Sequence, residues 1–227
     1  NFFISQSQFN QITSHEYVKN PKVLKSSSIY DSKNLRELSA NKTPNVDIQF
    51  LVVCWMTKDQ IARKSILKIL EALSYLSEDQ TKNLKLKIVG GLGDGVDFLK
   101  ENITNLSLEK IVSLEIDISN ERKIELYKNS DLYIQPSYYE GFGNSVLEAM
   151  SYGTPCLVSS YTAQPEVVMN SGYIINNIST DEIFKAIQNF IGKSSSEKLQ
   201  MISDVRKTVI ENHGYDKRLK EYLKFLE

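Results

Sequence analysis

Cysteine, histidine, proline and tryptophan are all scarce in this chain, and no long apolar segment interrupts it. Its 227 residues include two cysteines, two histidines, five prolines and one tryptophan. The cysteines and histidines lie far apart, so their spacing matches no structural zinc site and no metal is expected. No apolar run reaches the ~18 residues that cross a bilayer. The sequence therefore predicts neither a zinc-binding domain nor a membrane-spanning helix.

An excess of charge of one sign is also lacking. Lys and Arg total 27 and Asp and Glu total 28, a formal net charge of −1. A dedicated nucleic-acid binder needs a strongly positive surface, so no nucleic acid is expected as a partner. Hydrophobic residues make up 41% and charged residues 24%, ordinary values that exclude wholesale disorder. At roughly 150 residues per domain, the length predicts one large domain, or one domain and a fragment of another.

The cysteines and the first residue bear on cellular location. Cys54 and Cys156 lie in apolar runs, where each is interpreted as a small buried side chain. Unpaired thiols are typical of a reducing compartment, so a cytoplasmic location is expected, which includes the inner face of a membrane. No signal peptide is visible, but the chain begins with Asn1 rather than Met, so its absence says little about an intact protein.

Apolar segments of strand length alternate with segments of helical periodicity. The first strand of the regular pattern is predicted over 47–55, and apolar residues at helical spacing follow it from Ile66 to Leu76. Further strands are predicted within 84–95, 110–116, 132–137 and 154–160, and helices at 96–106, 121–130, 144–152, 180–192, 195–212 and 215–226. Short apolar segments, 2–5 and 23–30, and a polar linker, 31–47, come before them. The alternation is typical of βαβ units, so we predict an α/β fold with a parallel sheet covered by helices on both faces.

Ligands of such sheets bind beyond the carboxyl ends of the strands, so functional residues are expected in the loops that follow strands. The most informative loop begins at Tyr138. A glycine-rich turn, 140–143, follows a strand end, and Asn144 is the predicted N-cap of a helix that continues to Tyr152. The free amides at a helix start and the positive end of its dipole favour an anion such as a phosphate.

Two glutamates flank this predicted anion site. Glu140 lies in the turn, and Glu148 lies eight positions later, within the helix. Carboxylates beside an anion suit a ligand that also offers hydroxyl donors, such as a sugar and a ribose on the two sides of a diphosphate. The spacing alone leaves a plain structural alternative open, in which Glu140 is solvated and Glu148 pairs with a lysine.

The stretch EGFGNSVLEAMSYGTPCLVSSYTAQPEVV resembles the glutamate-pair signature of retaining glycosyltransferases of family 4, which have the GT-B fold of two Rossmann-like domains. Those proteins carry Glu-Gly-Phe-Gly, a second Glu followed by Ala-Met, a Gly-x-Pro and a Pro-Glu-Val. The corresponding residues here are 140–143, 148–150, 153–155 and 165–167. SDLYIQPS (130–137) and LKIVGGLGDG (86–95) resemble neighbouring strand ends of the family. The resemblance covers residues 46–227 well and 1–45 loosely.

The resemblance implies roles for the residues of this signature. Glu140 would bind hydroxyls of the donor sugar, and Glu148 would bind the ribose of the nucleotide. The backbone of Gly143, Asn144 and Ser145 would contact the diphosphate. The other donor-binding positions implied are Gly141 and Phe142 in the same turn, and Gly91 after an earlier strand.

The family also places an Arg and a Lys after the first strand of this domain, where they hold the diphosphate as it leaves. Arg63 and Lys64 fit that element, and together with Glu140 they are the expected catalytic residues. Fixed cations would stabilise the negative charge that builds on the leaving oxygen. The chain departs from the pattern at Ser65, where glycine is usual, and at Trp55, where many members have an arginine. A solvated basic pair on a helix face is the structural alternative.

The resemblance further implies the domain organisation. Residues 1–45 are interpreted as the remnant of an N-terminal acceptor domain with its linker, 46–212 as a Rossmann-like nucleotide-sugar-binding domain, and 213–227 as a C-terminal helix. The chain would then be the C-terminal, donor-binding half of a GT-B glycosyltransferase. Such a half is expected to be inactive in isolation.

The implied activity is transfer, with retention of configuration, of a sugar from a donor such as a UDP- or GDP-sugar to a saccharide or lipid-linked acceptor. Bacterial surface polysaccharide synthesis is the expected setting. The acceptor, and any peripheral membrane contact, would belong to the N-terminal domain, and no cofactor beyond the donor substrate is expected. The alternative from another class is a non-catalytic sugar-nucleotide-binding module of the same fold. A third alternative is another GT-B enzyme or an epimerase-type enzyme, which would share the phosphate site but use different acid/base residues, and the two glutamates disfavour it.

Overall fold

The computed structural model describes residues 47–214, the short segments 2–3 and 22–23, and positions 217, 219, 220 and 223. The predicted linker and most of the expected N-terminal remnant lie outside the described residues. Within that remnant, β1 (Phe2–Phe3) and β2 (Lys22–Val23) form a parallel pair. The helix predicted over 215–226 also lies mostly outside them, and its four described positions are helical.

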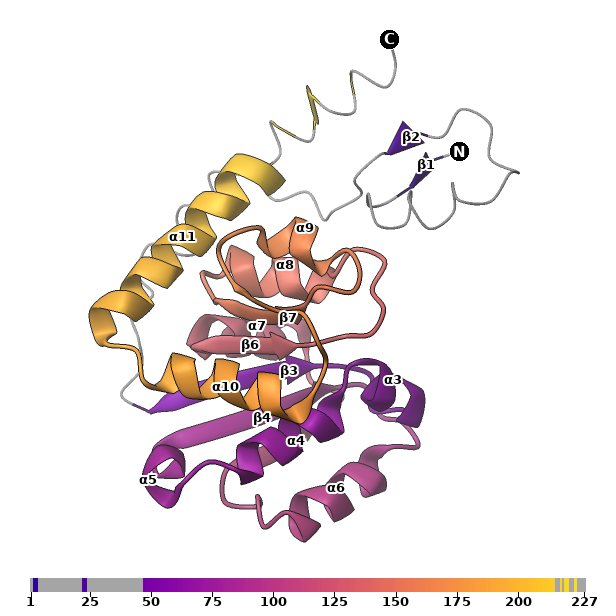
Figure 1. The fold of residues 1–227 in the computed structure, drawn as a ribbon. Helices are drawn as coiled ribbons and strands as arrows, with labels where there is room; N and C mark the ends of the chain where they lie inside the picture. Colours follow the sequence, from indigo (N-terminus) through magenta and orange to yellow (C-terminus); the bar gives the residue numbers. More distant parts are fainter. Residues whose placement is uncertain are drawn as a thin grey trace.

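The body of the molecule is a six-stranded sheet in the order β5-β4-β3-β6-β7-β8, in which every neighbouring pair is parallel (Figure 1). This confirms the predicted parallel α/β fold. The strands are β3 (Ile48–Val53), β4 (Leu84–Gly90), β5 (Val112–Ile116), β6 (Leu132–Gln135), β7 (Cys156–Ser159) and β8 (Tyr173–Ile175). The last strand was not predicted, because its three residues are too few to show a pattern.

Side chains alternate between two separate cores, because successive residues of a strand point to opposite faces. On β3, Phe50 and Val52 belong to one buried cluster, whereas Leu51 belongs to the other. The first cluster also takes residues from α4, α6 and α10, and the second from α7, α8, α9 and α11. Burial on both faces explains why β3 appears in the sequence as a continuous apolar run rather than an alternating one.

The helices of the described chain fall on the two faces accordingly (Figure 1). They are α3 (Lys58–Arg63), α4 (Ile66–Ser74), α5 (Glu78–Thr81), α6 (Val96–Asn105), α7 (Asn120–Asn129), α8 (Asn144–Ser151), α9 (Gln164–Val168), α10 (Thr180–Ile191) and α11 (Ser195–His213). The longer ones match the predicted helices. The helices α3, α5 and α9 were not predicted, because four to six residues are too short for a helical period to be recognised. Within the described residues, no helix is long and apolar enough to cross a membrane.

The start of α8 differs from the prediction by one residue. Gly143, rather than Asn144, occupies the N-cap position, and Asn144 is the first helical residue. The cap has φ of 97° and ψ of 49°, a left-handed conformation that glycine adopts without a Cβ clash. The turn therefore depends on glycine geometry rather than on a capping side chain.

A crevice forms where the direction of chain winding reverses. The neighbouring strands β3 and β6 are followed by α3–α4 and by α8, which pack on opposite faces of the sheet. In open parallel sheets the carboxyl-end edge at such a switch point is the usual place for a ligand. The predicted site residues after both strands are therefore brought to the same edge.

A charged cluster ties α7 to the sheet. Glu115 on β5 accepts hydrogen bonds from Arg122 on α7, from Nε at 2.9 Å and Nη2 at 2.8 Å, and from Lys87 Nζ on β4 at 2.9 Å. The hydrogen bonds from Arg122 are the main cause that lowers the pKa of Glu115 from 4.5 to about 2. The ionised carboxylate is thus favoured by folding.

The charged cluster predicts an acid-dependent stability. Because the pKa of Glu115 is depressed, its contribution is complete above pH 4.5 and disappears as the pH falls toward about 2. We expect Glu115→Gln to lower the free energy of unfolding at neutral pH by about 1–2 kcal/mol, after allowance for solvent screening. Urea denaturation at a series of pH values should show this difference shrinking below pH 4.5. Glu125→Gln, which removes the more exposed partner of Arg122, is the control and should change stability little. A difference that persists unchanged into acid would contradict the assignment.

Candidate active site

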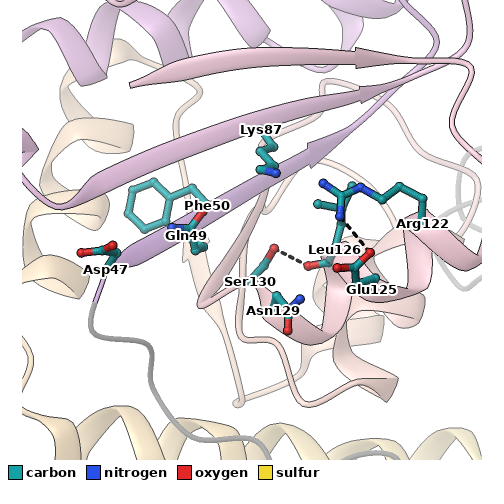
Figure 2. A pocket seen from close by; sticks show the side chains of 9 residues that line it. All are labelled: Asp47, Gln49, Phe50, Lys87, Arg122, Glu125, Leu126, Asn129 and Ser130. Carbon is teal, nitrogen blue, oxygen red and sulfur yellow. Dashed lines mark hydrogen bonds and ion pairs between the residues drawn. The ribbon is translucent and has the colours of Figure 1, made fainter. Parts of the chain in front are cut away.

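Two cavities lie near opposite ends of the central strands. One, of about 440 Å³, is lined by residues at the amino-terminal ends of β3 and β6, including Asp47, Gln49 and Ser130, and by Arg122 on α7 (Figure 2). The other, of about 390 Å³, lies at the carboxyl ends of β3 and β4, within the crevice. Parallel sheets bind ligands at the carboxyl ends, so the second cavity, here called the crevice cavity, is the candidate site.

The crevice cavity brings together residues from four separate parts of the chain. Four predicted site residues line it, from the segments after β3, β4 and β6: Arg63, Lys64, Gly91 and Ser145. The fourth part of the chain is the segment after β5. The other lining residues are Val53, Cys54, Trp55, Gln60, Val89, Gly90, Asp117, Ile118 and Lys123. The cavity thus combines cations and a hydroxyl with glycine backbone and apolar side chains.

Lys64 is buried between α3 and α4. Its Nζ donates to the carbonyl oxygen of Val53 at 2.7 Å and to Oε1 of Gln135 at 2.9 Å. Burial lowers the pKa of Lys64, and the nearby carboxylate of Glu140 partly opposes that effect. Ser65, which follows, has φ of 55°, a left-handed conformation that suits the glycine usual in the resembled family. The solvated alternative for this lysine is therefore wrong.

Arg63 links α3 to the glycine-rich turn. Its Nη1 lies 2.7 Å from Oε1 of Glu140 and donates to the carbonyl oxygen of Tyr139 at 2.6 Å. Its Nε and Nη2 both donate to Oε1 of Gln60. Glu140 Oε1 also accepts from Ser137 Oγ at 3.0 Å and from Gln135 Nε2 at 3.1 Å. The predicted catalytic trio of Arg63, Lys64 and Glu140 is thus part of one bonded network, and Glu140 is not simply solvated.

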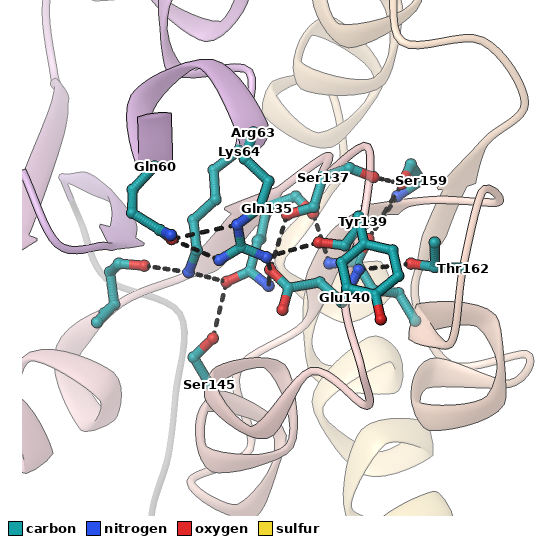
Figure 3. A network of polar contacts seen from close by, with 12 residues as sticks. Gln60, Arg63, Lys64, Gln135, Ser137, Tyr139, Glu140, Ser145, Ser159 and Thr162 are labelled. Atoms are coloured by element: carbon teal, nitrogen blue, oxygen red, sulfur yellow. Dashed lines mark hydrogen bonds and ion pairs between the residues drawn. The ribbon is translucent and has the colours of Figure 1, made fainter. Parts of the chain in front are cut away.

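Gln135 is the centre of this network, and the sequence analysis missed it (Figure 3). Its Oε1 accepts from Lys64 Nζ, from Ser145 Oγ at 2.7 Å and from Tyr133 OH at 2.6 Å, while its Nε2 donates to Glu140. Complete burial raises the pKa of Tyr133 well above its usual value, so this hydroxyl stays protonated and donates. The one available signal was a polar residue inside the apolar segment LYIQPS, because a fully buried amide must find partners.

The turn before α8 presents backbone rather than side chains. Phe142 is buried in the second core, with its ring edge-on to His213 at 6.2 Å between centroids. Asn144 is exposed, and Ser145 is half-buried with its hydroxyl bonded to Gln135. The first amides of a helix lack intrahelical acceptors, so this end of α8 offers donors toward the crevice. Any contact of Phe142 with a ligand would have to come from its backbone.

Glu148 lies one turn further along α8, beside a smaller cavity of about 280 Å³. Its Oε2 is 3.2 Å from Nζ of Lys123 on α7, and both side chains are partly exposed. Lys123 lines both this cavity and the crevice cavity, so the two adjoin. The lysine pairing that the spacing left open is therefore present, and both of its members line this smaller recess.

The arrangement can hold an anion and hydroxyl groups side by side. Arg63, Lys64 and the start of α8 lie together after the ends of β3 and β6, Glu140 is bonded to Arg63, and Glu148 lies one turn into α8. Among the described residues, no group of three or more metal-ligating side chains occurs. The chemistry on offer is electrostatic stabilisation of a phosphate and hydrogen bonding to a polyhydroxylated ligand.

Comparisons with known proteins identify the family. The chain belongs to the group 1 glycosyl transferases, whose family model matches residues 56–208. It is 31% identical over 121 residues to O-antigen chain mannosyltransferase B of Escherichia coli, a match that covers 53% of this chain and 32% of that protein.

Solved structures support the fold. A glycosyltransferase from Rickettsia africae ESF-5 superposes with a TM-score of 0.79 at 19% identity, covering 99% of this chain and 62% of that one. An Anabaena protein crystallised with UDP and glucose gives 0.77 at 16% identity, covering 99% and 62%. The chain therefore spans about a third of the E. coli relative and about three fifths of these structures. These likenesses confirm the predicted GT-B type of α/β fold.

The network predicts that replacement of Gln135 destabilises the fold. In Gln135→Leu, the buried donors of Lys64 and Tyr133 and the half-buried hydroxyl of Ser145 lose a shared acceptor, which we expect to lower the free energy of unfolding by about 1–3 kcal/mol. Chemical denaturation measures this change. The matched control is Gln200→Leu, at an exposed position of α11, which should alter stability little. Equal stability of the two variants would show that Gln135 is not needed to satisfy the network.

Proposed function

We propose that this chain is the donor-binding half of a retaining glycosyltransferase that takes a sugar from a nucleoside diphosphate sugar. The observation that carries the proposal is the convergence of Arg63, Lys64, Glu140 and the start of α8 on one crevice, with Glu148 one turn away. A nucleotide sugar carries its sugar hydroxyls, its diphosphate and its ribose in that order along the molecule. Retention of configuration is proposed from the glutamate-pair signature.

Each part of the donor is assigned to a part of the crevice. The sugar hydroxyls bind Glu140, whose contacts with Arg63, Gln135 and Ser137 all fall on Oε1 and leave Oε2 for the ligand. The diphosphate lies between the two cations and the backbone at the start of α8. The ribose binds Glu148, where its hydroxyls take over from, or share the carboxylate with, Lys123.

The two cations are assigned to stabilisation of the leaving group. Cleavage of the bond between sugar and phosphate builds negative charge on the leaving oxygen, and Arg63 and Lys64 stabilise that charge. Lys64 is held by Val53 and Gln135 before the reaction, so little reorganisation is needed. Because the charge of the lysine is already desolvated, its interaction with a developing oxyanion is stronger than it would be in water.

The relatives support the donor class and suggest the setting. One structural neighbour was crystallised with UDP and glucose, which favours a UDP-linked or similar donor. The E. coli relative is named an O-antigen chain mannosyltransferase, which favours a saccharide or lipid-linked acceptor in surface polysaccharide synthesis. We propose that the acceptor, and any contact with the inner face of a membrane, belongs to the other domain of the enzyme.

The donor site predicts nucleotide binding by the chain itself. Isothermal titration calorimetry with UDP, GDP and ADP should find at least one that binds with about 4–8 kcal/mol, a micromolar to millimolar Kd. Glu148→Gln should weaken that binding roughly tenfold, because ribose hydroxyls lose a charged acceptor worth about 1–3 kcal/mol. Glu101→Gln, on the exposed side of α6, is the control. An unchanged Kd in a folded Glu148→Gln variant would leave Glu148 as a structural partner of Lys123 alone.

Transfer requires donor and acceptor to be held together, a proximity that supplies several kcal/mol of the barrier. We therefore expect residues 1–227 to bind donor without transferring sugar, and a protein that carries both domains to turn over. In that protein Lys64→Met should lower kcat by about a hundredfold with little change in KM, because its charge matters most in the transition state.

The control for transfer is Lys100→Met, at an exposed position of α6. Rate measurements and the anomeric configuration of the product by NMR test the proposal. Efficient transfer by the chain alone, or an inverted product, would contradict it.

A further inference from the structure

The single tryptophan of the chain occupies an unusual place. Trp55 is 65% exposed, yet it lies directly after the central strand β3 and lines the crevice cavity. Its sequence neighbours, Cys54 and Met56, are both buried. This large, mostly exposed aromatic ring beside the crevice cavity has no part in the core, and the phosphate and hydroxyl contacts leave its role unexplained.

The neighbouring loop is built around this ring. Trp55 packs on Gly91, where an added Cβ would overlap the six-membered ring of the indole. A backbone hydrogen bond of 2.9 Å from Met56 N to Gly91 O joins the two loops at the same point. Gly91 therefore lets the indole lie against the backbone, and the two loops together fix one wall of the cavity.

The assignments already made to the other lining groups indicate, by elimination, which part of a ligand meets this wall. Glu140, assigned to the sugar, does not line the crevice cavity, whereas Arg63, Lys64 and Ser145 do. Lys123, the partner of Glu148, lines both the crevice cavity and the recess assigned to the ribose. The remaining part of the crevice cavity is formed by Trp55, the backbone of Gly90 and Gly91, Asp117 and Ile118. A ligand that places its sugar at Glu140 and its diphosphate at the cations directs its opposite end here.

We infer that Trp55 is the stacking platform for the base of the donor nucleotide, an inference that rests on the proposed function. The opposite end of a nucleoside diphosphate is a planar aromatic ring, which an indole face and an apolar side chain accommodate. Stacking engages the π-face that every base shares, so Trp55 supplies affinity for a nucleotide over a bare diphosphate. Discrimination between bases then falls to the edge contacts made by the neighbouring loops.

The test uses the fluorescence of the chain, because Trp55 is its one tryptophan. We expect UDP, GDP or ADP, whichever binds by calorimetry, to change tryptophan emission saturably with the calorimetric Kd. Inorganic pyrophosphate should bind at the cations and leave the emission nearly unchanged. The reading needs no variant and is independent of whether a substitution folds.

Variants give the second measurement. Trp55→Ala should weaken binding of the nucleoside diphosphate about tenfold, within the ~1–3 kcal/mol per stacked base, and leave pyrophosphate binding unaltered. Trp55→Phe, which keeps a smaller ring, should retain most of the affinity. The matched control is Leu92→Ala, which removes another exposed apolar side chain, 62% exposed, next to Gly91 on the loop after β4.

The outcomes separate the two proposals. Calorimetric binding of a nucleoside diphosphate without an emission change, and with unaltered affinity in Trp55→Ala, overturns the stacking role and leaves the donor site standing. An emission change with a nucleotide sugar but with no nucleoside diphosphate places the ring on the sugar and also overturns it. If no nucleoside diphosphate binds at all, the proposed function fails, and the stacking role fails with it.

Discussion

All six strands of the main sheet run parallel, so every return of the chain must be made by a segment that crosses one face of the sheet. This constraint gathers the carboxyl ends of the strands at one edge. It also makes β3 and β6 neighbours whose following helices leave on opposite faces. The crevice between them is a consequence of the winding, and the loops that line it are free to carry polar chemistry because the strands are held by two apolar cores.

Burial of a charge organises the polar side of that crevice. An ammonium group away from water needs acceptors, and Lys64 finds a strand-end carbonyl and the amide oxygen of Gln135. The same amide oxygen accepts from Tyr133 and Ser145, so one side chain of β6 coordinates groups from α3–α4, β6 and α8. The position of the lysine is thereby coupled to the start of α8, where the proposed diphosphate lies.

Both glutamates assigned to the ligand form ion pairs within the protein. Arg63 contacts Glu140, and Lys123 contacts Glu148, so each carboxylate that would accept hydroxyls is already paired with a cation. Both pairs are partly exposed, and pairs of that kind are worth little in water, so a ligand can rearrange them at modest cost. This suits the proposed binding of a highly charged donor and release of a highly charged product.

Much of the fold and some of the site were accessible from the sequence. Apolar runs such as 47–55 predicted the strands, because burial on both faces favours apolar residues at successive positions. The glycine-rich turn predicted a helix start that faces a ligand, because only glycine adopts the backbone angles found at Gly143 without strain. Short elements such as α5 and β8 were not predicted, because three or four residues are too few to show a helical or strand periodicity.

The tertiary structure decided which side chains meet. Gln135, the partners of Lys64 and the pairing of Glu148 with Lys123 all join residues that are far apart in the chain, and no local pattern encodes such contacts. The placement of Trp55 against Gly91 likewise depends on the register of β3 with β4, which brings the ends of the two strands together. The sequence by itself determined the alternation of elements and the residue types available at the strand ends, because local periodicity and turn geometry depend on neighbouring residues. Only packing in three dimensions decided how those side chains combine into one site, because hydrogen bonds and ion pairs require proximity in space.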